Sequence, residues 1–417
     1  MDQSGNFDGN DVGLKTINFE LNGELFGVDQ FINQYLSPGI LAHLLPEASG
    51  EKPPIHARTS LTAESLKRPP KVEILEPASG AVIDEESMEV KVKVTPQGAG
   101  VSGVALYHNG HKLPDSRRRQ VDDSTYLFSV KAMKGKNELR ASAFDGSGNV
   151  ESRRDRVRVL APDIEGRPPR LHLLSVGVDK YSSGLSLKFA EDDARTVSEL
   201  FRSELYETGE RKFLKNEEAT LAGITGAIKA IAAVAEPQDA FVFYLAGHGT
   251  VVGEEYYFLP HDVKIETDQA LTESAMSSSD LAGALSSVPA TKQLLVLDSC
   301  RSGKAVGVVS RYFSSRGGLE EIRSQQMLSR TSGTFLIAAT KGEEYAYEIS
   351  QLGHGVLTYA LLDSLGLAEG KAARGEVTAN DLLRAVSTKV PDLSEKYHGV
   401  RQQVIQYSSG QDFPLVK

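Results

Sequence analysis

The sequence predicts an α/β domain with a mostly parallel sheet and helices on both faces, preceded by an all-β sandwich. Two observations carry this prediction. From Leu171 onward, near-continuous apolar runs alternate with amphipathic patterns, which is typical of parallel strands covered by helices. Between Lys71 and Ala161 the hydrophobic period is two, and turn residues separate the short runs. The length of 417 residues, with 40% hydrophobic and 24% charged residues, allows two or three globular domains.

The first 70 residues carry a helical signal followed by a linker. Helical spacing lies on both sides of Ser37-Pro38 within residues 28–45, and Pro38 would occupy the first turn of a second short helix. Residues 46–70 are rich in Pro, Ser and charged side chains, which is typical of a linker. We therefore assign residues 1–70 to an N-terminal helical segment and linker.

Residues 71–161 form the predicted sandwich. About seven short alternating runs fit this segment, which favours a sandwich of immunoglobulin type. Asn109-Gly110 and Asp145-Gly146 stand between such runs, and Asn-Gly in that position is a strong hairpin signal. This segment shows no candidate chemistry, so we expect it to serve as a spacer or a docking surface.

A second linker, residues 162–170, leads to the α/β domain at residues 171–417. The apolar runs predict its strands, and the amphipathic runs predict its helices. The predicted strands are Leu171–Val178, Ala240–Gly247, Lys292–Asp298 and Gly333–Thr340, and the predicted helices are Glu191–Leu205 and Leu221–Ala235.

Charge and cysteine content limit the class of protein. A net charge of −10 argues against nucleic acid as the main partner, and the arginine-rich runs at 116–120 and 152–156 are expected to be solvated strand edges or turns. One cysteine cannot form an internal disulfide. No apolar run approaches the ~20 residues that a spanning helix needs, and the acidic, polar first residues are unlike a signal peptide. We expect a cytoplasmic protein with no membrane partner.

Two candidate catalytic residues follow predicted strands. His248 lies between two glycines after the strand 240–247, and Cys300, the only cysteine, follows the strand 292–298. Because sites in open α/β sheets form beyond the carboxyl ends of strands, these residues, 52 positions apart, could meet. An imidazole can take the proton of a thiol and make it nucleophilic. The two glycines would allow close backbone approach and unusual dihedral angles, and the N–H groups of Gly249 and Cys300 could stabilise an oxyanion.

Each of these residues also has a structural interpretation. A lone histidine is more commonly a buried structural residue, and a lone buried cysteine is more commonly an inert packing residue. Their joint position at strand ends, among glycines and polar residues, favours catalysis.

These residues resemble the motifs of the caspase-like superfamily, in its metacaspase, paracaspase and bacterial orthocaspase branches. The resemblance covers about residues 171–417 and implies a caspase–haemoglobinase sandwich fold and a cysteine endopeptidase that works through a thioester acyl-enzyme. DSCRSG around Cys300 is similar to the DxCxSG pattern of metacaspases and differs from the QACxG of animal caspases. The other similar stretches are YLAGHG around His248, LLSVGVDKYSSGLSLKFAEDDA at the opening strand, GHGVLTYALLDSL as the last helix and SSGQDFPL as the tail.

The resemblance also implies the residue after which the enzyme cuts. In the metacaspase and paracaspase pattern, the position of Asp298 lines the S1 pocket and selects Arg or Lys. Asp193 matches a second pocket carboxylate and Glu344 a third, although the sequence does not separate Glu344 from Glu343. Convergent carboxylates would bind a guanidinium bidentately and reject an acidic P1 side chain. The acidic stretch EDDA also fits the charge favoured at a helix N-terminus. This alternative stands level with the pocket for Asp192, whereas the pocket is favoured for Asp193.

Residues 301–332 separate the cysteine strand from the next predicted strand. In the family such a segment links the large and small portions and is often cut during activation. The alternative is an uncut loop that gates the substrate. The sequence has no EF-hand spacing, so we predict no metal and no other cofactor, with Ca²⁺ dependence left open. The candidate cleavage sites are Lys304, Arg311, Arg316, Arg323 and Arg330.

Three functional hypotheses remain. The leading one is a cysteine endopeptidase that cleaves proteins at exposed Arg or Lys residues, in a bacterial stress, cell-death or antiphage response. An upstream activating protease or a regulator would dock on residues 1–161. The main alternative is a non-catalytic caspase-like regulator or scaffold, which the presence of both His248 and Cys300 disfavours. The third is a hydrolase of another small acyl substrate that uses the same dyad.

Overall fold

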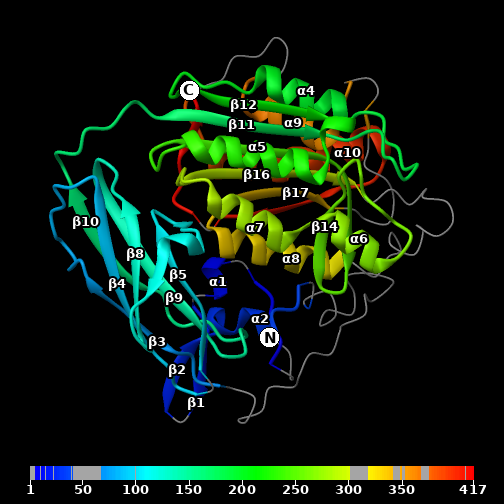
Figure 1. Cartoon of the computed structure of the whole chain (residues 1–417). Helices are drawn as coiled ribbons and strands as arrows, with labels where there is room; N and C mark the ends of the chain where they lie inside the picture. Colours follow the sequence, from blue (N-terminus) through cyan, green and yellow to red (C-terminus); the bar gives the residue numbers. More distant parts are fainter. Residues whose placement is uncertain are drawn as a thin grey trace. The chain divides into compact units, whose positions relative to one another are not determined.

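The computed structural model divides the chain into two units, residues 1–166 and 167–417, each with its own hydrophobic core (Figure 1). The residues that the structure describes are 5–9, 11–14, 16–21, 23–38, 40, 67–98, 100–300, 318–340, 348–349, 353–367, 375–408 and 410–417.

The N-terminal part of the first unit consists of short elements packed around aromatic side chains. Phe19 packs against the rings of Phe7, Phe31 and Tyr35, with centroid distances of 5.3–6.3 Å. The elements are α1 (Asp11–Leu14), the antiparallel pair β1 (Asn18–Leu21) and β2 (Glu24–Gly27), the 3₁₀ helix η1 (Val28–Phe31) and α2 (Ile32–Tyr35).

Two differences from the sequence prediction appear in this part of the chain. The first predicted helix consists of only η1 and α2, because Leu36 already has extended backbone with ψ of 120°. The β1–β2 hairpin was not predicted. The second helix, expected after Pro38, falls on residues of which the structure describes only residue 40.

The sandwich follows in the first unit and is built from two four-stranded sheets. The side chains of Val90, Val92 and Phe128 meet those of Leu106 and Leu139 in the core between them. Asn109 and Gly110 both have positive φ, 50° and 91°, as a tight hairpin turn requires, so the predicted turn between β5 and β6 is confirmed. One sheet holds β3 (Lys71–Glu76), β4 (Ser87–Thr95), β8 (Thr125–Lys131) and β7 (Arg118–Gln120), and the other holds β10 (Asp155–Ala161), β9 (Gly135–Asp145), β5 (Val101–His108) and β6 (His111–Lys112).

The second unit is built on a mostly parallel sheet, which confirms the predicted fold class. Its main strands lie in the order β12-β11-β13-β16-β17-β21, and all neighbours are parallel except β17 and β21. These strands are β11 (Arg170–Gly177), β12 (Glu207–Lys215), β13 (Ala240–Val252), β16 (Lys292–Cys300), β17 (Phe335–Thr340) and β21 (Gln403–Tyr407). Shorter strands are β14 (Glu255–Phe258), β15 (Met276–Ser277), β18 (Glu348–Ile349), β19 (His354–Gly355), β20 (Val377–Thr378) and β22 (Pro414–Val416).

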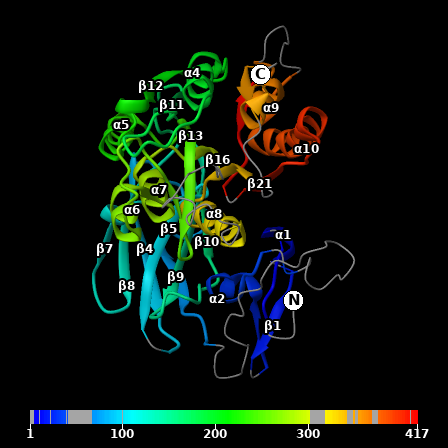
Figure 2. The same cartoon turned by 90° about the vertical axis from the view of Figure 1, so that its right-hand side faces the viewer.

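Helices cover both faces of this sheet (Figure 2). One face, which we call the α5 face, packs against α5 (Leu221–Val234), α6 (Asp268–Ser274), α7 (Ser278–Ser287) and α8 (Gly318–Ser332). The opposite face, the α9 face, packs against α4 (Ala190–Leu200), α9 (Val356–Ser364) and α10 (Ala379–His398). Across the described residues, no helix combines the length and the apolar character needed to cross a membrane.

Three predictions about helices and loops of the second unit need correction. Helix α4 ends at Leu200 rather than at Leu205, because Phe201 leaves helical geometry with ψ of 96°. The second half of the segment 301–332 is not a loop, because α8 starts at Gly318. The helix within residues 353–365 is α9, and α10 follows it, so α9 is not the last helix.

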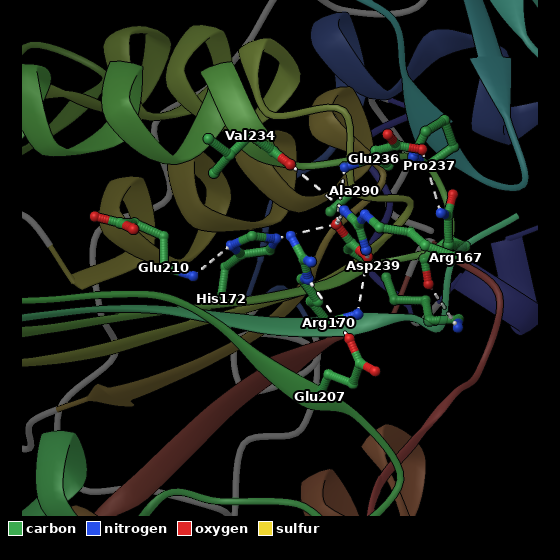
Figure 3. A network of polar contacts seen from close by, with 12 residues as sticks. Arg167, Arg170, His172, Glu207, Glu210, Val234, Glu236, Pro237, Asp239 and Ala290 are labelled. Carbon is green, nitrogen blue, oxygen red and sulfur yellow. Dashed lines mark hydrogen bonds and ion pairs between the residues drawn. The ribbon is translucent and has the colours of Figure 1, made fainter.

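A buried carboxylate holds the first residues of the second unit. Asp239 accepts hydrogen bonds from both terminal nitrogens of Arg167, at 2.8 and 2.6 Å, and from the backbone N–H of Arg170 at 2.8 Å (Figure 3). His172 Nε2 lies 3.0 Å from the same carboxylate, and its Nδ1 accepts the Glu210 N–H at 2.9 Å. His172 therefore carries its hydrogen on Nε2, and this N–H donates a hydrogen bond to the Asp239 carboxylate. This network fixes the start of β11 at the amino end of the sheet, opposite the end where β13 and β16 carry the candidate site.

Candidate functional site

The two predicted catalytic residues lie opposite each other on neighbouring strands. Strands β13 and β16 run parallel, and their register pairs His248 with Cys300 and Ala246 with Asp298. The apolar runs that precede them are fully buried in the sheet, so these strands give the site a rigid support. The Cys300 side chain lies outside the part of the chain that the structure describes.

His248 is fully buried and lies against the ring of Tyr181. Its backbone N–H donates to the Tyr181 hydroxyl at 2.7 Å, and the rings of Tyr181 and His248 lie 5.0 Å apart. A Cβ on Gly247 would lie 2.9 Å from the Tyr181 hydroxyl, and one on Gly249 would lie 2.7 Å from the Tyr256 ring. Both glycines are therefore required for close approach. Neither glycine has positive φ, so the expectation that they adopt unusual dihedral angles was wrong.

The backbone of Gly249 points toward the cysteine strand. The carbonyl of Ala246 accepts from Val178 N–H, and the carbonyl of His248 accepts from Leu259 N–H. Backbone groups of successive residues point to opposite edges of a strand. The N–H of Gly249 is thus directed away from Val178 and Leu259, to the side where β16 ends at Cys300.

Asp298 is half-buried and bound by two hydroxyl groups. Its Oδ2 accepts from Thr358 Oγ1 at 2.8 Å and from the Tyr244 hydroxyl at 3.2 Å, and the two hydroxyls are 2.6 Å apart. Removal from water, together with the negative charge of Asp193, raises the pKa of Asp298 to about 7. This carboxyl therefore changes charge near neutral pH.

Asp193 is buried in the first turn of α4. The carboxylate of Asp179 caps that helix by accepting the N–H groups of Ala190 and Glu191, which fixes where Asp193 points. Asp193 accepts from the Gly355 N–H at 3.0 Å, and its other oxygen lies 2.8 Å from His354 Nδ1. Burial raises the pKa of Asp193 above its usual value, while these contacts oppose the rise.

The two carboxylates converge on one point at the start of α9. A Cβ on Gly355 would lie 2.8 Å from Asp193 Oδ2 and 3.5 Å from Asp298 Oδ2. Asp193 comes from α4 and Asp298 from β16, so only the folded sheet brings them together. Two carboxylates that lie close together are suited to binding a cationic group.

The remaining predicted residues are only partly described. Glu344, Lys304, Arg311 and Arg316 lie outside the described residues. Arg323 and Arg330 are in helix α8, where Arg323 Nη1 pairs with Glu254 at 2.7 Å. A protease binds its substrate as an extended chain, so this helical backbone does not suit cleavage at those two positions. Within the described ranges, no three His, Cys, Asp or Glu side chains gather as metal ligands would.

Sequence reasoning missed several residues of this site. Tyr244 and Thr358 bind Asp298, and His354 binds Asp193. The position of Tyr244 could have been found, since it lies four residues before His248 on the same face of the strand. Nothing in the sequence places Thr358 and His354 there, because their positions depend on how α9 packs.

Comparison with known proteins agrees with this architecture. Residues 170–414 match the caspase domain, and residues 70–141 match a bacterial Ig domain. No curated protein matches the chain.

Solved structures show low similarity. Protein GSU0716 from Geobacter sulfurreducens is 16% identical with a TM-score of 0.36, and the match covers 60% of this chain and 94% of that one. Caspase-1 from Spodoptera frugiperda is 12% identical with a TM-score of 0.35, covering 61% of this chain and 92% of that one. The fibronectin(III)-like modules of Clostridium thermocellum CbhA are 18% identical with a TM-score of 0.18, covering 22% of this chain and 97% of those modules. The caspase-domain match itself spans more than half of the sequence, and the chain therefore belongs to the caspase domain family.

Proposed function

We propose that this protein is a cysteine endopeptidase that cleaves proteins after Arg or Lys with His248 and Cys300. The observation that carries the proposal is the convergence of Asp193 and Asp298 at Gly355, at the carboxyl end of β16 and beside His248 of β13. Two carboxylates there can bind a guanidinium or an ammonium group, and they would repel an acidic P1 side chain.

The proposed reaction uses His248 as the base and Cys300 as the nucleophile. His248 takes the proton of the Cys300 thiol, and the thiolate attacks the P1 carbonyl carbon. The N–H groups of Gly249 and Cys300 stabilise the resulting oxyanion. His248 returns the proton to the leaving amine as the C–N bond breaks, which leaves a thioester. Water, deprotonated by His248, then hydrolyses the thioester and frees the thiol.

Fluorogenic peptides with Arg, Lys or Asp at P1 test this proposal. Wild-type protein should cleave after Arg and Lys and not after Asp, and Cys300→Ala and His248→Ala should be inactive. Asp298→Asn should lose cleavage after Arg while Cys300 still reacts with iodoacetamide. Cleavage after Asp alone would refute the pocket assignment, and full activity of Cys300→Ala would refute the nucleophile.

Two other outcomes separate the alternatives. Turnover of small thioesters or esters without peptide cleavage would favour an acyl hydrolase. Absence of all turnover, with Cys300 unreactive toward iodoacetamide, would favour a non-catalytic regulator.

We further propose activation by cleavage between Cys300 and α8, by the protein itself or by an upstream protease. Lys304, Arg311 and Arg316 are the sites, and Arg323 and Arg330 drop out because they lie in α8. Mass spectrometry of active protein should find a cut among these three sites, and an intact chain would refute activation by cleavage. Activity that survives EDTA would be consistent with a metal-free mechanism.

The proposed role is a regulated cytoplasmic protease of a bacterial stress, cell-death or antiphage response. In it, residues 1–70 and the sandwich at 71–161 dock a regulator, and residues 171–417 act on protein substrates. Deleting residues 1–161 should leave peptide cleavage intact and abolish its response to the activating signal.

A further inference from the structure

One tyrosine contacts a residue adjacent in sequence to each of the two proposed catalytic residues. Tyr256, on β14, is fully buried. Its hydroxyl donates to Ser299 Oγ at 2.8 Å, and Ser299 directly precedes Cys300. The same ring lies against Gly249, where a Cβ would come within 2.7 Å of both Cε2 and the hydroxyl oxygen. Gly249 directly follows His248, so a single rigid ring contacts β13 next to His248 and β16 next to Cys300.

These contacts lie on the face of the sheet opposite the carboxylate pocket. Side chains alternate between faces along a strand. Leu297 belongs to the α5-face core, so Ser299 is on that face too, and Tyr256 packs in the same core. Tyr244 belongs to the α9-face core, and Asp298, which it contacts, lies on that face. Tyr256 therefore supports β13 and β16 from the face opposite the two carboxylates and does not occupy the substrate side.

The backbone of Tyr256 is itself anchored. Its N–H donates to Ser324 Oγ of α8 at 3.0 Å, and that hydroxyl donates to Ser278 Oγ of α7 at 2.8 Å. The neighbouring pair of Arg323 and Glu254, 2.7 Å apart, ties α8 to the same hairpin. A tyrosine fixed at its backbone and enclosed along its ring can hold a hydrogen-bond partner in place with little freedom.

We propose that Tyr256 is a positioning residue, which sets the relative placement of His248 and Cys300 through its hydrogen bond to Ser299 and its contact with Gly249. The inference rests on the proposed dyad. It assigns Tyr256 no contact with substrate.

Removing only the hydroxyl tests the inference. In Tyr256→Phe the ring remains and the bond to Ser299 is lost. We expect kcat for Arg peptides to fall about tenfold, as the loss of one buried hydrogen bond allows, and KM to stay within about twofold. The pH midpoint for alkylation of Cys300 by iodoacetamide should rise, because the thiolate is held less well by His248. Tyr257→Phe is the matched control. Among the described residues, the Tyr257 hydroxyl makes one long hydrogen bond, of 3.5 Å to Glu255, so kcat should be unchanged.

A second variant separates positioning from folding. Ser299→Ala removes the other partner of the same hydrogen bond and should reproduce the fall in kcat, and the double variant should be no worse than either single one. Additive losses in the double variant, a wild-type kcat in Tyr256→Phe, or a change confined to KM would overturn the inference. If wild-type protein cleaves no peptide, the proposed function fails by itself. The alkylation profiles of wild type and Tyr256→Phe then still decide whether Tyr256 affects Cys300.

Discussion

Asp193 and Asp298 come from different elements, yet both carboxylates border the space that a side chain at position 355 would fill. A Cβ on Gly355 would lie 2.8 Å from Asp193 and 3.5 Å from Asp298. Gly355 has φ of −61°, so alanine is compatible with its backbone. The effect of an alanine would therefore be steric and confined to the carboxylate pair.

The first prediction concerns this position. Gly355→Ala should raise KM for P1-Arg peptides about tenfold or more, because the methyl group displaces Asp193 from the site of the guanidinium. Alkylation of Cys300 by iodoacetamide should keep its wild-type rate. Gly226→Ala, on helix α5 with nothing within 4 Å of the new Cβ, is the control. A wild-type KM in Gly355→Ala would mean that the P1 side chain binds elsewhere.

The second prediction follows from the pKa of Asp298. Burial and the charge of Asp193 raise this pKa to about 7 in the free protein. A P1 cation binds the ionised carboxylate, so kcat/KM for Arg peptides should rise with pH and level off above about 7. At saturating substrate the bound guanidinium keeps the carboxylate ionised, so kcat should lack this acidic limb.

The pH profile of Cys300 alkylation distinguishes the ionisation of Asp298 from the ionisations of His248 and Cys300. Iodoacetamide does not use the carboxylate pocket, so its pH profile reports only His248 and Cys300. The profile of kcat/KM should contain at least one ionisation more than the alkylation profile does, because the carboxyl groups of Asp298 and Asp193 take no part in alkylation. Identical profiles would contradict the assignment of Asp298 to the pocket.

The meeting of His248 and Asp298 on neighbouring parallel strands could be predicted from sequence, whereas the second partners of the carboxylates could not. The predicted end of the first of these strands, at Gly247, was wrong, because β13 continues to Val252, where it pairs with β14. His248 and Asp298 follow apolar runs, and parallel strands bring their carboxyl ends to one edge of the sheet. His354 and Thr358 reach that edge only because α9 packs on the α9 face, which no local pattern encodes. Strand β12 was missed for another reason. It is an edge strand whose side chains are largely charged and half-exposed, so it lacks the apolar run that identified its neighbours.

The third prediction concerns a conflict between stability and function at Asp298. A raised pKa means that the folded protein holds this proton more tightly than the unfolded chain does. Stability therefore falls as pH rises from about 4 to about 7. Asp298→Asn keeps an acceptor for Thr358 and carries no charge. Its free energy of unfolding should exceed that of wild type at pH 8 by up to roughly 4 kcal/mol, and should match it near pH 4.

Urea unfolding at the two pH values measures this difference. Asp192→Asn is the control, because the Asp192 side chain is 64% exposed, and this substitution should change the free energy of unfolding by less than about 0.5 kcal/mol at both pH values. A less stable Asp298→Asn at pH 8 would show that ionised Asp298 is better stabilised in the fold than its surroundings imply.

The last prediction concerns the opposite end of the sheet, where Asp239 holds Arg167, Arg170 and His172 (Figure 3). Burial favours the neutral acid, but the hydrogen bonds from His172, Arg167 and the backbone outweigh it and hold the pKa of Asp239 well below its usual value. The stabilisation is therefore present above the unfolded-state pKa of about 4 and is lost as pH falls below it.

Asp239→Asn should lower the free energy of unfolding by about 3–5 kcal/mol at pH 7, because it removes the carboxylate that pairs with the Arg167 guanidinium. Glu207→Gln is the control, since its pair with Arg170 is exposed and 3.7 Å long, and it should change stability by less than about 0.5 kcal/mol. Equal stability of Asp239→Asn and Glu207→Gln at pH 7 would show that the network does not anchor the start of β11.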